Sequence, residues 1–205
     1  MAFPFISQPK LLKYFFPKVG DILFIALLFG CNQLGTRMLS IDSDLGRHLT
    51  LGNIILDTGT IPIIDILSHT KEGESRPPYE WGAQVLFATA NRIAGLDGVV
   101  LLTSLVVAST FLLAYLESVK LSKAPIASAF ATILCAGASS IHWLPRPHIF
   151  TFLLLLLWVV HLEKLRKEEH VPIWVFRIIM LFWANLHGGF IFGFLAWFAS
   201  LAGEI

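Results

Sequence analysis

Long hydrophobic runs separated by short charged connections make up most of this chain. Runs long enough to cross a bilayer cover residues 19–40, 97–117, 124–142 and 147–163, and a longer run covers 172–203. A transmembrane helix needs roughly 17–25 mostly apolar residues, so the last run is too long for one helix. We expect it to break at Asn185-Leu186-His187-Gly188-Gly189 into two short spans, 172–186 and 190–203. The pattern predicts an all-α polytopic transmembrane helical bundle of about six spans.

The composition supports a membrane protein and excludes several other classes. Hydrophobic residues make up 56% of the 205 positions and charged residues only 14%, which is typical of an integral membrane protein. The net charge of +1 gives no basic excess, so no nucleic-acid partner is predicted. Cys31 and Cys135 both lie in apolar runs and predict neither a disulfide framework nor a zinc site.

The lysines and arginines of the short connections predict the orientation. They fall in three groups on the same side: Lys10, Lys13 and Lys18; Lys120 and Lys123; Lys164, Arg166 and Lys167. Because positive residues stay in the cytoplasm, the N-terminus is expected to be cytoplasmic, with the loop 41–96 and the turn 141–148 on the outer side. The predicted location is the cell's inner (plasma) membrane, which the chain crosses several times. The basic N-terminus followed by residues 22–29 also resembles a signal peptide, but the later runs favour an uncleaved anchor.

The outer loop 41–96 carries two further amphipathic patterns. Residues 44–58 predict a helix along the membrane surface, with Leu45, Leu49 and Leu56 as its apolar stripe. Gly59 and Pro62 are expected to end this helix. A second amphipathic helix is predicted over 80–94, so the loop offers a scaffold for a site at the bilayer surface.

The acidic pair Asp42 and Asp44 is the first candidate for chemistry. Two carboxylates this close suit a divalent cation such as Mg²⁺ or Mn²⁺, or a general base with an electrostatic partner. The alternative is an N-cap with an acidic first turn. His48, four residues after Asp44 on the predicted helix, favours the functional interpretation.

Other polar residues gather on the same predicted face. Arg146, between two prolines and beside His148, is a rigid cation suited to a phosphate, although snorkelling to lipid headgroups is the alternative. Asn185 and His187 interrupt an apolar run and need partners, which for Asn185 could be a helix–helix hydrogen bond. The remaining candidates for substrate binding are Asp65 and Glu80.

Together these residues resemble bacterial polytopic glycosyltransferases of the GT-C type. The resemblance covers most of 41–193 and consists of short motifs in a consistent order. They are Asp42-x-Asp44-x-x-x-His48-Leu49-x-x-Gly52, Thr60-Ile61-Pro62-x-x-Asp65, Glu80-Trp81, Arg146-Pro147-His148-Ile149-Phe150-Thr151 and Trp183-Ala184-Asn185-Leu186-His187-Gly188-Gly189. Members often have aromatic residues before the histidine, where this chain has Gly46-Arg47, so substrate contacts there are expected to differ.

The resemblance implies an enzyme that transfers a sugar from a polyprenyl-phosphate carrier at the outer face, with Asp44 or Asp42 as the base. Members are usually longer, so residues 1–205 are expected to be one transmembrane module that matches their N-terminal part. The alternative is a non-catalytic membrane subunit of a larger complex. A third interpretation is a transporter that would use Asn185 and His187 as its site.

Overall fold

The apolar runs form helices in the computed structural model, which describes residues 17–76 and 79–203. The helices are α2 (Val19–Gln33), α3 (Gly35–Ile41), α4 (Leu45–Thr58), α5 (Trp81–Ser122), α6 (Pro125–Ser139), η1 (Ser140–His142), α7 (His148–Arg166), α8 (Ile173–Leu186), η2 (Gly188–Phe190) and α9 (Ile191–Ala202). The described residues contain no strand, only one isolated bridge between Ile64 and Ser75. The predicted all-α class is therefore correct. Lys10 and Lys13, which were used to predict the orientation, lie outside the described residues.

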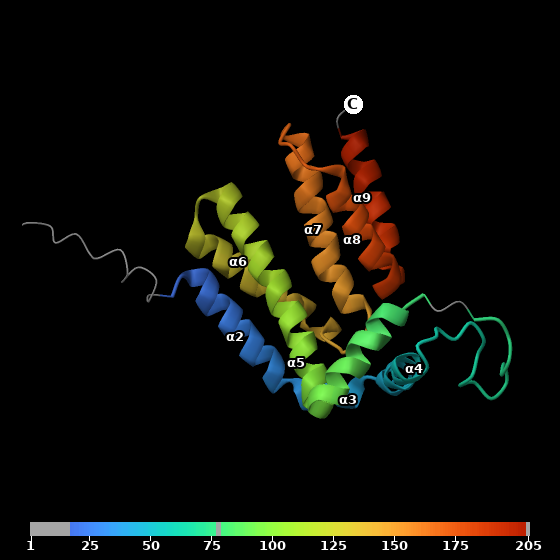
Figure 1. Cartoon of the computed structure of the whole chain (residues 1–205). Helices are drawn as coiled ribbons and strands as arrows, with labels where there is room; N and C mark the ends of the chain where they lie inside the picture. Colours follow the sequence, from blue (N-terminus) through green and yellow to red (C-terminus); the bar gives the residue numbers. More distant parts are fainter. Residues whose placement is uncertain (1–16, 77–78, 204–205) are drawn as a thin grey trace, which may run out of the picture.

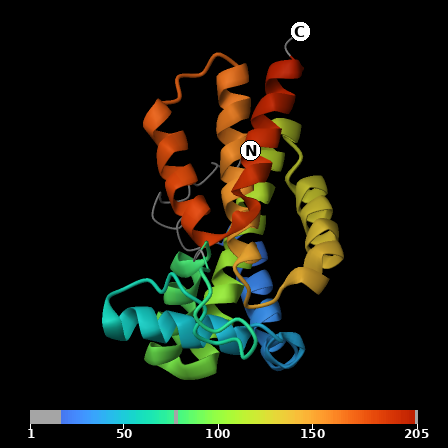
Figure 2. The same ribbon diagram turned by 90° about the vertical axis from the view of Figure 1, so that its right-hand side faces the viewer.

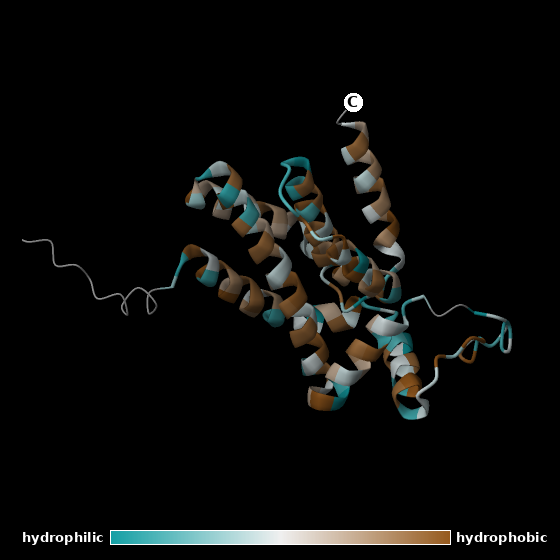
Figure 3. Ribbon diagram, turned by 45° about the horizontal axis from the view of Figure 1, so that its top comes forward, coloured by the Kyte–Doolittle hydropathy of each residue, from teal (hydrophilic) through white to brown (hydrophobic). Residues whose placement is uncertain are grey.

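Three helices are long and apolar enough to cross a membrane: Trp81–Ser122, Pro125–His142 and His148–Arg166. A fourth span results if α2 and α3 count as one, and α8 and Gly188–Ala202 are apolar but shorter. Figure 3 shows hydrophobic residues over most of these helices and hydrophilic residues concentrated in the connections. The structure thus indicates a polytopic membrane protein with three or four candidate spans.

The first predicted run, 19–40, is bent and not straight. Helices α2 and α3 meet at Leu34 with an angle of 51°. A Cβ added to Gly35 would lie 2.9 Å from Cγ1 of Val100 on α5. The close approach of α3 to α5 at this glycine accompanies the bend.

Helix α5 contains both the second amphipathic helix and the second apolar run predicted from the sequence. Its backbone leaves the helical region at Ala94 and Gly95, and Gly95 has a φ of 61°, which glycine adopts without strain. Figure 1 shows the resulting sharp turn: the shorter first part of α5 crosses one end of the molecule, and the longer second part runs back along the bundle. Figure 2 shows α4 lying across that same end.

Helix α4 packs on the first half of α5 through a glycine contact. Its buried residues are Leu45, His48, Gly52 and Ile55, and a Cβ at Gly52 would overlap the backbone carbonyl of Gln84. The predicted apolar stripe is wrong at Leu56, which is 37% exposed. The close contact at Gly52 directs the helix face that carries His48, Gly52 and Ile55 towards α5, and Leu56 lies outside that face. Gly59 ends the helix as predicted, with a φ of 66°.

A buried hydrophobic cluster joins the elements at this end of the bundle. It contains residues of α4, α5, α7 and α8, which are Leu45, Ala83, Phe87, Val99, Val106, Ile149, Phe150 and Leu186. Arg92 of α5 additionally hydrogen-bonds the Asn53 side chain at 2.7 Å and pairs with Asp57 on α4. The polar residues beside this cluster are therefore held by packed helices.

Candidate functional site

Residues from four separate segments surround one cavity at the end of the bundle where α4 crosses. The cavity has a volume of about 200 Å³. Its lining residues are Asp44, Arg47, His48, Glu80, Arg146, Pro147, His148 and His187. They come from the start of α4, the residue before α5, the connection from α6 to α7 and the break between α8 and α9.

Asp42 lies behind the cavity wall and holds Arg146. Its Oδ1 accepts a hydrogen bond of 2.9 Å from Nε of Arg146 and another of 2.8 Å from the backbone N–H of Asp44. The Asp42 side chain is 0% exposed. Since Pro145 and Pro147 also restrict the backbone on both sides of Arg146, the guanidinium has a well-defined position at the cavity.

Asp44, in contrast, is open to the cavity. Its side chain is 45% exposed, and Oδ2 lies 3.5 Å from Nη1 of Arg146. It occupies the N-cap position of α4, but its side chain makes no capping hydrogen bond. The alternative of a simple capping role therefore does not account for the Asp44 carboxylate, which is the more accessible of the acidic pair.

The acidic pair fits an arginine better than a divalent cation. Asp42 and Asp44 both direct an oxygen at Arg146, so a guanidinium already lies between the two carboxylates. Among the described residues, no group of three or more His, Cys, Asp or Glu side chains is arranged to hold a metal ion. The predicted Mg²⁺ or Mn²⁺ site thus does not match the donor set around these residues.

His48 contributes a neutral imidazole. The residue is 2% exposed, and its burial, aided by the nearby Arg47, lowers the pKa of the imidazole to about 4. Its Nδ1 is buried and has no hydrogen-bond partner among the described residues. At neutral pH His48 therefore adds a polar but uncharged group to the wall beside Asp44.

The hydrogen bonds of the other two imidazoles assign opposite roles to them. Nε2 of His148 lies 2.8 Å from the carbonyl oxygen of His142, so this nitrogen carries the proton and Nδ1 is the acceptor. Nδ1 of His187 accepts the backbone N–H of Gly189 at 3.0 Å, which leaves the proton of the neutral ring on Nε2. The cavity wall thus includes one imidazole that can accept and one that can donate.

Thr151 connects His187 to the core. The Trp183 indole N–H donates to Oγ1 of Thr151 at 2.9 Å, and the same oxygen lies 2.9 Å from Nδ1 of His187. Because Nδ1 of His187 is the acceptor nitrogen, the Thr151 hydroxyl donates to it. Trp183 is fully buried, so the orientation of His187 depends on the packed interior.

Two predicted site residues lie outside this cavity. Asn185 accepts a hydrogen bond of 2.7 Å from the indole N–H of Trp81 and donates one of 2.7 Å to the Leu181 carbonyl, which is the helix–helix role that the sequence left open. Asp65 pairs with Arg76 at 3.0 Å in the loop between α4 and α5. Glu80 lines both this cavity and the neighbouring pocket that contains Asp65.

No protein family, curated protein or solved structure matches this chain.

The functional interpretation therefore rests on the cavity, which includes a residue that the sequence analysis did not select as a site residue. Arg47 lines the cavity from α4, next to His48, and its signal in the sequence was the substitution of Gly46-Arg47 for aromatic residues. Thr151 was also missed, although it closes the Arg146-to-Thr151 motif. Its role depends on contacts with α8 and the break after α8, which no local pattern reveals.

Proposed function

We propose that the chain belongs to a membrane glycosyltransferase of the GT-C type, which transfers a sugar from a polyprenyl-phosphate carrier at the outer membrane face. The observation that carries this proposal is the convergence of Asp44, Arg146 and a neutral His48 on one cavity at one end of an apolar bundle. A sugar joined to a lipid phosphate needs this combination of an accessible carboxylate, a fixed cation and a membrane-embedded scaffold.

In this proposal, Asp44 removes the proton from the acceptor hydroxyl. The acceptor oxygen then bonds to the anomeric carbon, and the bond from that carbon to the carrier phosphate breaks with its electron pair on the phosphate. Arg146 and the Nε2–H of His187 offset the charge on the departing phosphate. Asp42 does not touch the substrate in this scheme and acts as a positioning residue for Arg146.

The proposal includes the topology of about six spans with a cytoplasmic N-terminus in a bacterial inner membrane. In support, Lys120 and Lys123 lie where α5 and α6 meet, and Lys164 lies at the end of α7. Figure 1 places these connections at the opposite end of the bundle from α4. In this topology α8 and α9 are the two short final spans.

The decisive test is sugar release from defined polyprenyl-phosphate donors by the Asp44→Asn protein. The amide preserves the shape of the carboxylate but cannot accept a proton, so the rate should fall about 10²–10⁴-fold. Asp97→Asn is the matched control, because Asp97 is exposed and lies outside the cavity lining. It makes the same chemical change and should retain the wild-type rate.

Equal rates for the Asp44→Asn and wild-type proteins would reject Asp44 as the base. If the Glu80→Gln protein loses sugar release instead, the role of the base moves to Glu80, the other carboxylate on the cavity wall. A wild-type protein inactive toward every donor tested would favour the alternative of a non-catalytic membrane subunit.

A further inference from the structure

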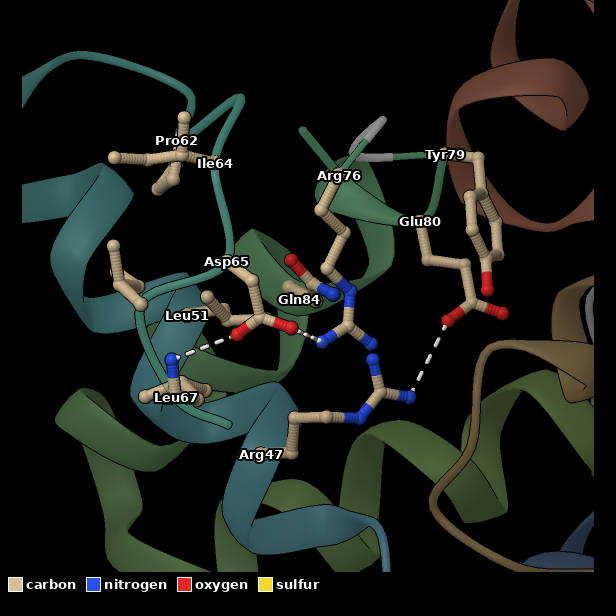
Figure 4. A pocket seen from close by; sticks show the side chains of 11 residues that line it. Arg47, Leu51, Pro62, Ile64, Asp65, Leu67, Arg76, Tyr79, Glu80 and Gln84 are labelled. Atoms are coloured by element: carbon tan, nitrogen blue, oxygen red, sulfur yellow. Dashed lines mark hydrogen bonds and ion pairs between the residues drawn. The ribbon is translucent and has the colours of Figure 1, made fainter. Parts of the chain in front are cut away.

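A second, smaller pocket adjoins the cavity, between α4, the loop residues 62–76 and the start of α5. Figure 4 shows that its charged and amide side chains are Arg47, Asp65, Arg76, Glu80 and Gln84, with the Tyr79 hydroxyl beside Glu80. Its volume is about 30 Å³, which suits a small group such as a carboxylate or phosphate oxygens and excludes a whole sugar ring. Arg47 and Glu80 line both this pocket and the cavity, so the two spaces are neighbours.

Arg76 has a fixed position in this pocket. Its Nη1 lies 3.0 Å from Oδ2 of Asp65, and Oδ1 of Asp65 accepts the backbone N–H groups of Leu67 and Ser68 at 3.0 and 2.9 Å. These hydrogen bonds, with the charge of Arg76 as a smaller contribution, lower the pKa of Asp65 to about 2. Asp65 is therefore ionised at neutral pH and holds Arg76 through one of its nitrogens.

Arg47 is much less satisfied than Arg76. Its closest acidic atom is Oε2 of Glu80, 3.7 Å from Nη2, which is longer than a hydrogen bond. In the described part of the chain Glu80 is its one acidic partner, so most of its five N–H donors have no partner there, although the side chain is only 30% exposed. Burial raises the pKa of Glu80, and the nearby Arg47 charge opposes this rise.

The two guanidiniums face each other across the pocket. Figure 4 shows the Arg47 and Arg76 side chains pointing toward one another. Like charges at short range repel, and the apolar residues Leu51 and Ile64 in the lining limit screening by water. An anion between the two arginines would remove this repulsion and occupy the unused donors of both.

Gln84 provides a second, independent indication of a ligand. The residue is 4% exposed and lines the same pocket, but its side-chain amide has no hydrogen-bond partner among the described residues. Its amide atoms are not fully enclosed, so they are open to the pocket. Its NH₂ group is available to an oxygen bound between the arginines.

We propose that Arg47, Arg76 and Gln84 form a subsite for an anionic group of the acceptor, either a carboxylate or a phosphate. This proposal rests on the proposed function, because only a transferase has an acceptor at this position. The subsite adjoins the cavity through Arg47, so an acceptor held here by its anionic group extends its hydroxyl toward Asp44. Neutral acceptors of the same size would lack this anchor.

Anion binding can be measured directly on the full chain in a neutral detergent, without sugar transfer. The probes are inorganic phosphate, followed by ³¹P line broadening, and glucuronate, followed by saturation-transfer NMR with glucose as the neutral comparison. Wild-type protein should bind at least one of the two anions and not glucose. In the Arg47→Gln protein, binding of that anion should weaken about tenfold or more, because a charged double hydrogen bond is lost.

Lys71→Gln is the matched control, since it removes one positive charge from the loop between α4 and α5. Lys71 is 68% exposed, pairs with Glu74 and is not in the pocket lining, so this variant should bind like wild type. Arg47→Lys keeps the charge without the planar fork and should give intermediate affinity. Circular dichroism melting would show that each variant is folded.

Equal anion binding by the Arg47→Gln and wild-type proteins, or no binding by wild type, would overturn the proposal. If phosphatidylglycerol vesicles bind wild type more strongly than the Arg47→Gln protein while phosphate and glucuronate do not bind, the anion is a lipid headgroup and the acceptor assignment is wrong. Failure of the Asp44 test with intact anion binding would reject Asp44 as the base and leave the anion site in place, since the two measurements are independent.

Discussion

Asp42 and Asp44 are separated by one residue, yet only Asp44 is accessible from the cavity. The Asp42 carboxylate is enclosed and bonded to Arg146, while the Asp44 carboxylate is nearly half exposed. Asp42 also accepts the Asp44 N–H at 2.8 Å, which fixes the short turn between them. The D-x-D pattern therefore combines a positioning residue with a candidate catalytic one.

The two carboxylates should respond differently to the same substitution. Asp42→Asn removes the charge that pairs with Arg146 and should lower the free energy of unfolding by about 1–3 kcal/mol. Asp44→Asn, at a partly exposed position, should change it by less than about 0.5 kcal/mol. Melting curves of both proteins in the same detergent would test the difference, and equal stability would show that the Asp42–Arg146 bond contributes nothing.

His48 should make the stability of the protein sensitive to acid. Its folded pKa of about 4 lies below the ordinary value of 6.5, so between these values the unfolded chain binds a proton that the folded chain does not. The free energy of unfolding should therefore fall as the pH decreases from 6.5 to 4, by at most about 3 kcal/mol. Melting temperatures between pH 7 and pH 4.5 provide the measurement.

The His48→Gln protein is the comparison for this titration. Glutamine carries no titrating group, so the variant should show a shallower decrease in melting temperature over the same pH range, whatever its stability at pH 7. Asp65, with its pKa of about 2, loses its contribution only below its ordinary pKa of 3.8 and does not account for this window. Parallel pH profiles of the two proteins would contradict the assignment to His48.

At the scale of the helices, the contact between α4 and α5 depends on one glycine. A methyl group at Gly52 would overlap the Gln84 carbonyl and approach the Ala88 Cβ to 2.7 Å. Gly52→Ala should therefore destabilise the protein by about 1–3 kcal/mol. Gly46→Ala is the matched control in the same helix, because no atom lies within 4 Å of its added Cβ, and it should be neutral or stabilising by up to about 1 kcal/mol.

Melting temperatures of the two alanine variants in detergent would show this contrast. A Gly52→Ala protein as stable as Gly46→Ala would mean that α4 can move away from α5 at little cost. In that case Arg47 and His48 would not be held firmly at the cavity wall.

The helices themselves were largely predictable from the sequence, because their signals are local. Gly59 and Pro62 correctly predicted the end of α4, and Gly188-Gly189 correctly predicted the break after α8. The bend at Leu34 was missed because it accompanies a contact of Gly35 with Val100, sixty-five positions away in the chain. Leu56 was assigned to the wrong face because the contact at Gly52 determines which side of α4 is buried.

The site was predictable in kind and not in detail. Asp44, His48 and Arg146 were selected because charged or polar residues near a membrane need partners, and the structure brings them to one cavity. Their individual roles depend on burial and on bonds between distant segments. Asn185 illustrates the limit, since its partner Trp81 is 104 residues earlier and no spacing rule connects them.

At the scale of the whole molecule, the proposed orientation has a direct test at the outer loop. Ser75 is exposed and lies in the loop between α4 and α5. In a Cys135→Ser background, which removes the exposed native thiol, Ser75→Cys should react with a membrane-impermeant maleimide on intact cells. A thiol labelled only after the cells are lysed would place this loop in the cytoplasm and reverse the orientation.

The bonds that close the cavity also determine when it can form during synthesis. Arg146 reaches back to Asp42, and Asn185 reaches back to Trp81, each across 104 residues. At about 5–20 residues per second, a ribosome needs roughly 5–20 s to make such a stretch. For that interval α4 and the start of α5 have left the ribosome without their later partners. The cavity is therefore among the last parts of this segment to assemble in the membrane, and a chain stalled before α8 would carry the acidic pair without a completed site.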